Sequence, residues 1–177
     1  QRWTMTGDDR LNCYGIDEKN HVAEQWFQKN IFSTVKQCLG DDKMRSIFGM
    51  YTESVKPYVI HSDEYHVAKN NKIGKPFKSW LIPYKVDGSR TDISAASTII
   101  FNEIEYGDDR NSIGDSLRQK YFTHCDQTLL KKVSIYEILH WEPGSLIYWD
   151  QRYLHCSGSF NCFKTKEMFV GHTFIPD

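Results

Sequence analysis

The chain has 177 residues, and its 22 lysine and arginine residues nearly balance its 23 aspartate and glutamate residues, so the formal net charge is -1. This length suits one domain with a buried core, and we expect a single domain over residues 1–177. The balanced charge provides no field for nucleic acid or an anionic membrane surface, and no stretch approaches the roughly 18 apolar residues of a membrane span. We therefore expect neither a nucleic-acid partner nor a membrane partner.

The five cysteines are an odd number and include no CxxC pair. A chain of this length does not need disulfides to stabilise its core, so reduced thiols are the expected state. The first residues, Gln1–Thr4, contain no apolar signal core. These features together predict a cytoplasmic protein.

The N-terminal part of the chain predicts a loop followed by helices. Residues 1–16 mix turn-forming residues with scattered aromatic ones, which favours a loop with at most a short strand. Apolar side chains then recur at helical spacing between Asp17, a suitable N-cap, and Gly40, a suitable stop. A second, short helix is predicted over residues 42–48, where three apolar residues share one helical face. Both helices are expected to buttress a sheet.

The remainder of the chain predicts a mainly β fold. Short apolar or alternating runs are separated by Gly-Lys-Pro, Asp-Gly-Ser and Pro-Gly turns, with no alternation of strands and long helices that would favour a parallel sheet. We expect two packed sheets. The predicted strands cover residues 58–61, 79–84, 97–101, 145–149 and 168–175.

A long polar stretch interrupts the predicted strands. Residues 102–128 show no strand periodicity and exceed the length of an ordinary hairpin loop. Loops of this length in a compact domain are commonly functional. We therefore predict a lid or a substrate-facing insertion at residues 102–128.

Three residues form the strongest chemical motif. His61 and Asp63 are separated by one residue, so their side chains point the same way in an extended segment, and His155 follows far downstream after an apolar strand. Two imidazoles and one carboxylate occupy one face of an octahedral metal and leave the other face open, an arrangement typical of non-haem Fe(II) oxygen chemistry. His66 offers an alternative, because it could complete a local metal site with His61 and Asp63.

These motifs resemble those of the Fe(II)- and 2-oxoglutarate-dependent dioxygenases. The segment Trp141–Ser157, with its Pro-Gly turn, apolar strand and His155, resembles the distal-histidine strand pair of that superfamily, and Tyr58–Asp63 resembles its H-x-D strand. The nearest subfamilies are the phytanoyl-CoA hydroxylase-like and prolyl-hydroxylase-like enzymes. The resemblance implies a double-stranded β-helix, a cupin-like jelly roll with N-terminal buttressing helices. It also implies that His61, Asp63 and His155 bind Fe(II).

The same resemblance implies 2-oxoglutarate as co-substrate and O2 as oxidant. In that family a cation after the distal histidine binds the far carboxylate of 2-oxoglutarate, and a buried charge of this kind needs satisfied hydrogen bonds. Lys166, eleven residues after His155, is our first candidate, and Lys164 is the alternative. The chain departs from the family pattern in having lysine rather than arginine there, and Met168 rather than a hydroxyl residue two positions later.

Other side chains are candidates for binding small molecules. Tyr84 and Thr98 lie on strands expected to cross the barrel and could hydrogen-bond the 2-oxoglutarate carboxylate, with core packing as the alternative. Arg152 lies three residues before His155 and could contact a substrate carboxylate or phosphate, although a surface ion pair is the default for such a residue. His172 could line the cavity from the last strand.

The predicted function is hydroxylation of an unactivated C–H bond in a small molecule or a peptide side chain, with release of succinate and CO2. Related halogenases carry a small residue where this chain has Asp63, so the intact carboxylate favours hydroxylation. Two alternatives remain open. One is a cupin-type metal-dependent dioxygenase or isomerase, and the other is a non-catalytic β-sandwich binding module.

Overall fold

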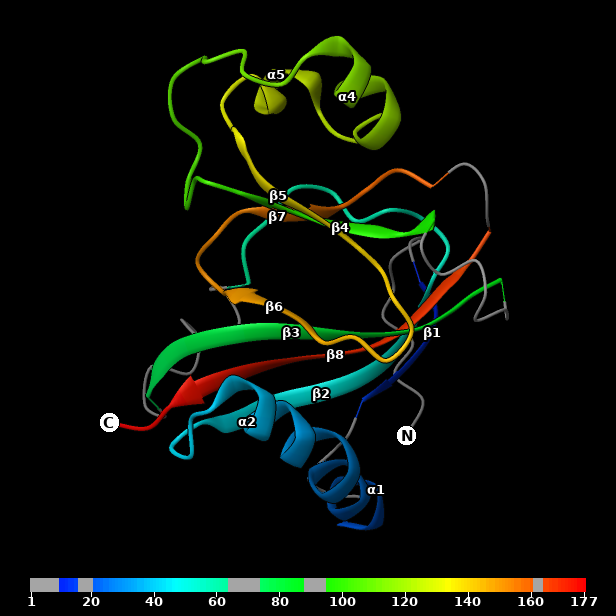
Figure 1. Cartoon of the computed structure of the whole chain (residues 1–177), viewed down its shortest axis with the longest axis vertical. Helices are drawn as coiled ribbons and strands as arrows, with labels where there is room; N and C mark the ends of the chain where they lie inside the picture. The colour runs from blue at the N-terminus through cyan, green and yellow to red at the C-terminus, as the bar shows by residue number, and fades with distance from the viewer. Residues whose placement is uncertain (1–9, 16–20, 64–73, 88–94, 161–163) are drawn as a thin grey trace.

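Two antiparallel β-sheets form the centre of the protein. The computed structural model describes residues 10–15, 21–63, 74–87, 95–160 and 164–177. Within these residues the smaller sheet lies above the larger one in Figure 1, with helices on the outer side of each. The larger sheet contains, in spatial order, β1 (Arg10–Gly15), β2 (Arg45–Ser54), β8 (Lys166–Ile175), β3 (Lys75–Val86) and β6 (Ile147–Asp150). The smaller sheet contains β5 (Ile135–His140), β4 (Ser97–Phe101) and β7 (His155–Ser157).

The mainly β prediction is confirmed, and four of the five predicted strands are present as β3, β4, β6 and β8. The exception is the strand predicted over residues 58–61. In that segment only His61 pairs, through an isolated antiparallel bridge to His155. The segment is therefore an irregular connection whose backbone bonds β7 at Tyr58 and at His61, where the metal motif begins.

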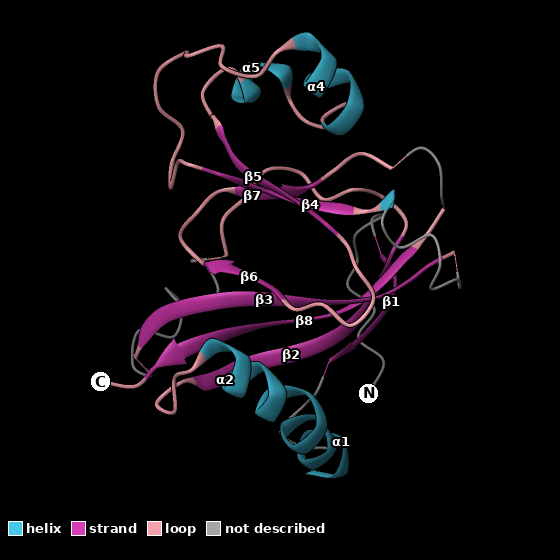
Figure 2. Cartoon of the chain, viewed as in Figure 1, coloured by secondary structure: helices cyan, strands magenta, loops and turns pink. Residues whose placement is uncertain are grey.

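The predicted N-terminal helix is confirmed over the residues that the structure describes there. It consists of α1 (His21–Phe27), a π-helical turn (Gln28–Phe32) and α2 (Ser33–Leu39), and it ends at Gly40, whose φ of 67° is left-handed. Asp17, the predicted N-cap, lies outside the described residues. The helix covers the outer face of the larger sheet (Figure 2). Its buried side chains Phe27, Phe32 and Val35 pack with Trp80 of β3.

The second predicted helix, over residues 42–48, is wrong. β2 begins at Arg45 and pairs with β8 along its whole length. Met44 is fully buried beside the N-terminal helix. The apolar spacing in this short window reflects that burial and not a helix, because ten residues of backbone pairing outweigh the small differences in intrinsic propensity.

Two short helices cover the outer face of the smaller sheet. α4 (Asp115–Tyr121) lies within the predicted 102–128 insertion, and α5 (Gln127–Leu130) begins within it and ends two residues beyond it. Phe122 and Leu130 from this region pack against Ile99 and Phe101 of β4. The insertion is thus anchored by a buried apolar cluster, while its role as a lid stays a prediction.

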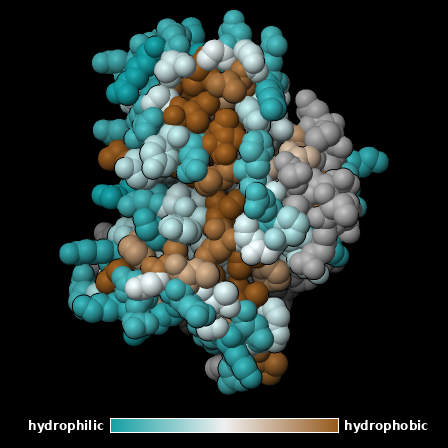
Figure 3. Space-filling model, in the orientation of Figure 1, coloured by the Kyte–Doolittle hydropathy of each residue, from teal (hydrophilic) through white to brown (hydrophobic). Residues whose placement is uncertain are grey.

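The surface agrees with this layered arrangement. Figure 3 shows hydrophobic residues gathered in a band that runs down the middle of this face, with hydrophilic residues on both sides. Between the sheets, a further apolar cluster includes Leu81, Trp141, Phe160 and Met168. In the part of the chain that the structure describes, no helix has the length and apolar character needed to cross a membrane.

Candidate metal centre

The three residues of the metal motif are brought together where the two sheets meet. The backbone N–H of His61 donates to the carbonyl of His155 at 3.0 Å, and the N–H of His155 donates to the carbonyl of His61 at 2.8 Å. Two residues later, the N–H of Asp63 donates to the carbonyl of Gln151 at 3.1 Å. These bonds fix both ends of the His61–Asp63 segment against the turn and strand that carry His155.

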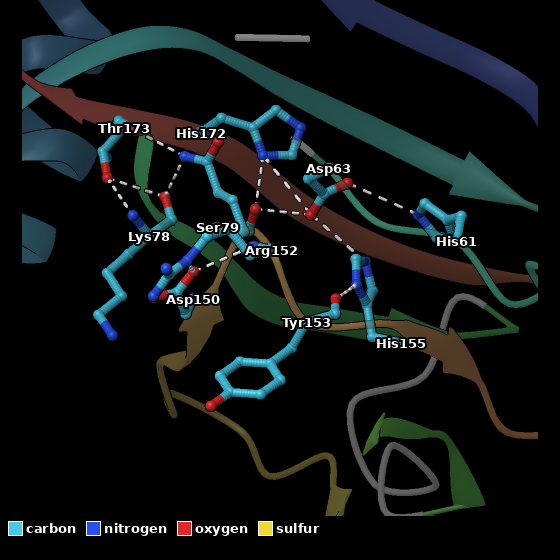
Figure 4. A network of polar contacts seen from close by, with 11 residues as sticks. His61, Asp63, Lys78, Ser79, Asp150, Arg152, Tyr153, His155, His172 and Thr173 are labelled. Carbon is cyan, nitrogen blue, oxygen red and sulfur yellow. Dashed lines mark hydrogen bonds and ion pairs between the residues drawn. The ribbon is translucent and has the colours of Figure 1, made fainter. Parts of the chain in front are cut away.

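The ligand atoms are close enough to share one ion. His61 Nε2 lies 3.6 Å from Asp63 Oδ1, and His155 Nε2 lies 3.3 Å from Asp63 Oδ2 (Figure 4). Atoms bonded to one first-row metal at about 2.1 Å lie about 3 Å apart when the bonds are at right angles. The group therefore fits a metal ion with only small side-chain adjustments. The alternative site that used His66 lies outside the described residues.

Each of the two histidine rings is oriented by a hydrogen bond to the backbone carbonyl two residues before it. Nδ1 of His61 bonds the carbonyl of Val59 at 2.8 Å, and Nδ1 of His155 bonds the carbonyl of Tyr153 at 3.1 Å. A carbonyl can only accept, so each Nδ1 carries the proton and each Nε2 keeps a free lone pair. Burial lowers the pKa of His155 to about 4, against a smaller opposing effect of Asp63. The imidazole is consequently neutral near pH 7 and able to bind a metal.

Asp63 is held by a buried polar network that the sequence did not reveal. The hydroxyl of Ser79 donates to Asp63 Oδ2 at 2.6 Å and lies 2.7 Å from Nδ1 of His172. Because serine has one proton to give, His172 must donate to Ser79 through Nδ1–H. Burial acts to raise the pKa of Asp63, but the imidazoles of His155, His61 and His172 outweigh it and hold the pKa well below its usual range. The carboxylate is therefore ionised and fixed.

Gln151 supports this arrangement from the turn before His155. It is completely buried, and its Nε2 donates to the carbonyls of Lys78 and Thr173 at 3.1 and 2.5 Å. The backbone carbonyl of Gln151 accepts from the backbone N–H of Asp63. The side-chain amide thus ties the turn to β3 and β8, and the backbone of the same residue positions Asp63. In the sequence, the role of Gln151 was indicated only by a polar residue four positions before His155.

A cavity of about 350 Å³ opens beside the three ligands. Alternate residues of β8 form one wall, as expected for one face of a strand. The expectation that His172 lines the cavity is confirmed. The residues that β8 contributes are Lys166, Met168, Val170 and His172. Across from them lie Thr98, His155 and Ser157 of the smaller sheet.

Comparison of structures relates this arrangement to known enzymes. The structure of the non-haem alpha-ketoglutarate-dependent epimerase SnoN from nogalamycin biosynthesis matches 98% of this chain with a TM-score of 0.58 at 9% identity. EvdO2 from Micromonospora carbonacea var. aurantiaca matches 93% with a TM-score of 0.54 at 12% identity, and AviO1 from Streptomyces viridochromogenes Tue57 matches 98% with a TM-score of 0.50 at 10% identity. The chain has the fold of non-haem 2-oxoglutarate-dependent enzymes. The resemblance seen in the sequence motifs is confirmed at the level of the fold.

The similarity is structural and partial. No family profile matches the sequence, and no curated protein matches it. The chain spans 66% of the SnoN chain, 68% of the EvdO2 chain and 72% of the AviO1 chain. The comparison therefore shows a shared fold and does not assign the activities of those proteins to this chain.

Lys166, the first candidate for the co-substrate anchor, lies in the wall of this cavity. Its side chain is buried in the cavity wall, and its Nζ donates to Ser157 Oγ at 2.5 Å. It also lies over the ring of Trp141, 4.9 Å from the centroid, and 5.5 Å from that of Phe160. Ser157 follows His155 by two residues on β7, a separation of about 7 Å along a strand. That spacing is comparable to the length of a five-carbon diacid.

The structure distinguishes the other anchor candidates. Lys164 precedes β8 and is exposed, and its backbone N–H donates to Asp87 at 2.7 Å. It is not among the described residues that line the cavity. Thr98 does line the cavity, where its hydroxyl accepts from Trp141 Nε1 at 3.1 Å. Of these two residues, Thr98 lines the cavity and Lys164 does not.

Two predicted binding residues lie away from the cavity. Tyr84 packs edge-on against Tyr51 and Phe169, with ring centroids 6.2 and 6.0 Å apart, so it serves sheet packing and not the carboxylate. Strand parity explains this, because Tyr84 follows Ser79 by an odd number of residues. Arg152 is exposed and forms a surface ion pair with Asp150 at 2.9 Å, which was the alternative to substrate binding in the sequence analysis.

Trp149 contributes a polar group that the sequence analysis did not anticipate. It lines the cavity, and its ring centroid lies 4.7 Å from that of His155. Its Nε1 is buried and has no hydrogen-bond partner among the described residues. A buried donor without a partner costs about 1–3 kcal/mol, and an acceptor bound in the cavity is one way to satisfy it. Trp80 Nε1 and Gln151 Oε1 are likewise buried without a partner among the described residues, but of these three residues only Trp80 and Trp149 line the cavity.

Proposed function

We propose that this protein is an Fe(II)- and 2-oxoglutarate-dependent oxygenase that hydroxylates an unactivated C–H bond. In this reaction one oxygen atom of O2 enters the substrate and the other enters succinate, with release of CO2. The observation that carries the proposal is the cavity itself, which is lined by two imidazoles, a carboxylate and a buried lysine. A cupin-type enzyme without a co-substrate would have no need for that lysine.

The donor set fits a ferrous ion. Two neutral nitrogens and one ionised carboxylate oxygen are typical ligands of non-haem Fe(II), and they leave coordination positions open toward the cavity. His61, Asp63 and His155 would hold the ion, and the ion with 2-oxoglutarate and O2 would supply the oxidising power. Ser79 fixes the second oxygen of Asp63, an arrangement that commonly tunes metal affinity.

The chain provides the remaining elements of the reaction. Lys166 offers the positive charge for the far carboxylate of 2-oxoglutarate, and Thr98 lies beside it in the cavity wall. The N–H of Trp149 is free to donate to a bound acceptor near His155. The apolar side chains of Leu81, Met168 and Val170 also line the space, and an apolar lining limits access of water to the reacting atoms.

The outcome of C–H oxidation depends on the substrate, and relatives in fold differ in outcome. SnoN is an epimerase. Product mass separates the alternatives, because hydroxylation adds one oxygen atom, whereas epimerisation leaves the mass unchanged. We propose hydroxylation of a small molecule or a peptide side chain. Succinate release over a panel of amino acids, acyl thioesters and peptides is the assay to find the substrate.

An anaerobic titration tests the proposal directly. Correctly folded protein should develop a weak visible charge-transfer band only when both Fe(II) and 2-oxoglutarate are present. A binding module without a metal would give no band, and a metal-only enzyme would give no change on adding 2-oxoglutarate. Absence of the band in folded, iron-loaded protein would refute the proposed function.

A further inference from the structure

A second group of metal-binding side chains lies behind the candidate iron site. His124, Cys125 and Cys156 each offer one ligand atom, and these atoms all lie within 4.8 Å of one another. His124 and Cys125 are in the turn between α4 and α5, and Cys156 directly follows His155 on β7. Cys156 packs in the apolar cluster under α4 and α5 and, like its neighbour His155, also contributes to the wall of the cavity.

The two cysteines of the group lie in the protein interior. Both sulfurs belong to the buried cluster that joins the smaller sheet to α4 and α5, where Cys125 is 6% exposed and Cys156 is 1% exposed. Cys125 Sγ lies 3.4 Å from His124 Nε2. Atoms bonded to one tetrahedral ion at the usual Zn–S and Zn–N lengths lie about 3.5 Å apart. This contact already has the spacing of two ligands of one ion.

The surroundings of His124 suit a ligand histidine. Its Nδ1 lies 2.9 Å from Ser159 Oγ, and Ser159 Oγ also accepts from the backbone N–H of Thr123 at 3.0 Å. Nε2 of His124 lies 3.1 Å from the carbonyl oxygen of Tyr58 and, since a carbonyl only accepts, it carries the ring proton in this arrangement. Ion binding would require that proton to move to Nδ1, where the hydroxyl oxygen of Ser159 can accept a second bond, so that Nε2 would then face the sulfurs.

We propose that His124, Cys125 and Cys156 bind one zinc-type ion at a site separate from the iron site. Two thiolates and one imidazole favour zinc over the harder cations magnesium and calcium, and two thiolates neutralise its charge in this buried place. The bound ion would tie the turn between α4 and α5 to β7, the strand that carries His155. This proposal does not depend on the oxygenase proposal.

Cobalt titration gives a direct test, because only sulfur ligands produce intense near-ultraviolet charge-transfer absorption with Co²⁺. Metal-free full-length protein should show these bands, saturating at one equivalent. They should persist in His61→Ala, which removes an iron ligand, and in Cys38→Ser, which removes an exposed thiol of α2. They should disappear in Cys125→Ser and in Cys156→Ser. Absence of the bands in the wild type, or their persistence in Cys125→Ser, would overturn the proposal.

A second measurement needs no substitution and so avoids variants that fail to fold. Zinc should slow alkylation of Cys125 and Cys156 in the wild type by at least tenfold, as followed by peptide mass, while Cys38 should react at an unchanged rate. Equal rates with and without zinc would contradict the site. A disulfide between Cys125 and Cys156 that forms in the presence of saturating zinc would also contradict it, since it would identify a redox pair.

Discussion

At the scale of single residues, the Asp63 carboxylate contacts both histidines of the candidate metal centre and the supporting Ser79. One oxygen faces His61, and the other faces His155 and accepts from Ser79. We expect Asp63→Ala to abolish iron binding and to lower turnover by more than about 100-fold, and Ser79→Ala to lower iron affinity by roughly 10- to 100-fold. Anaerobic iron titration and succinate release measure both effects. Asp108→Ala, in an exposed loop, is the matched control and should match the wild type.

Lys166 and Lys164 are separated by one residue and yet lie in opposite environments, so they form a natural pair for testing the anchor. Removing one partner of a buried charge pair costs about 3 kcal/mol, which is roughly 100-fold in affinity. We expect Lys166→Met to raise the KM for 2-oxoglutarate by about that factor, while Lys164→Met leaves it unchanged. Iron binding should survive in both variants. An equal effect of the two substitutions would show that the anchor is misassigned.

The indole of Trp149 is expected to donate to a bound ligand through its unpartnered N–H. Trp149→Phe keeps an aromatic ring beside His155 and removes only the donor. We expect a loss of about 1 kcal/mol in affinity for 2-oxoglutarate or for substrate, near fivefold, because one hydrogen bond is lost. The melting temperature of the ligand-free protein should stay the same or rise, since a buried unsatisfied group is removed. A fall in ligand-free stability with unchanged KM would assign Trp149 to packing alone.

At the scale of elements, the contact between the N-terminal helix and the larger sheet depends on Gly49 of β2. A Cβ at this position would lie 2.2 Å from the ring of Phe27, which is itself 1% exposed. We expect Gly49→Ala to destabilise the fold by about 2 kcal/mol, because the packed ring must move. Gly107→Ala is the control, since nothing lies within 4 Å of a Cβ there. Denaturant unfolding measures the difference between the two.

The elements also show what the sequence could and could not predict. β4 matches its predicted range, because five consecutive apolar or small residues between turns favour a fully buried strand. β5 was not predicted, since the outward Glu137 and Tyr136 break its apolar pattern. β7 is only three residues long and is defined by its pairing with β4, a property that no local pattern contains.

The ligand group of the candidate site could be predicted from local sequence, whereas its supporting residues could not. A metal site requires particular side chains at particular spacings, and such a pattern can be recognised in the sequence. This is why the group of His61, Asp63 and His155 could be predicted. Ser79 and Gln151 could not be found, because their roles depend on contacts between segments far apart in the chain. The spacing after His155 placed Lys166 on a strand that lines the cavity, while its role as anchor stays a prediction. The prediction for Tyr84 was wrong because the parity of β3, which turns Tyr84 to the other face, was not known.

At the scale of the whole molecule, the candidate site connects the two sheets. His155 belongs to the smaller sheet, and Asp63 is held by Ser79 of the larger one. In the same cavity, Lys166 of the larger sheet donates to Ser157 of the smaller sheet. A metal and a diacid bound here would add contacts to both sheets at two points. Ligand binding and the stability of the whole fold should therefore be coupled.

Thermal unfolding tests this coupling. A ligand present at 100 times its Kd stabilises the native state by about 2.7 kcal/mol, and for a domain of this size each kcal/mol raises Tm by about 2–4 °C. We expect Fe(II) to raise Tm under anaerobic conditions, and 2-oxoglutarate to raise it further only when the metal is present. In Asp63→Ala both increments should vanish, whereas in Lys166→Met the metal increment should remain and the second should be lost. A 2-oxoglutarate increment that persists without metal would mean that the diacid binds elsewhere, because chelation requires the ion.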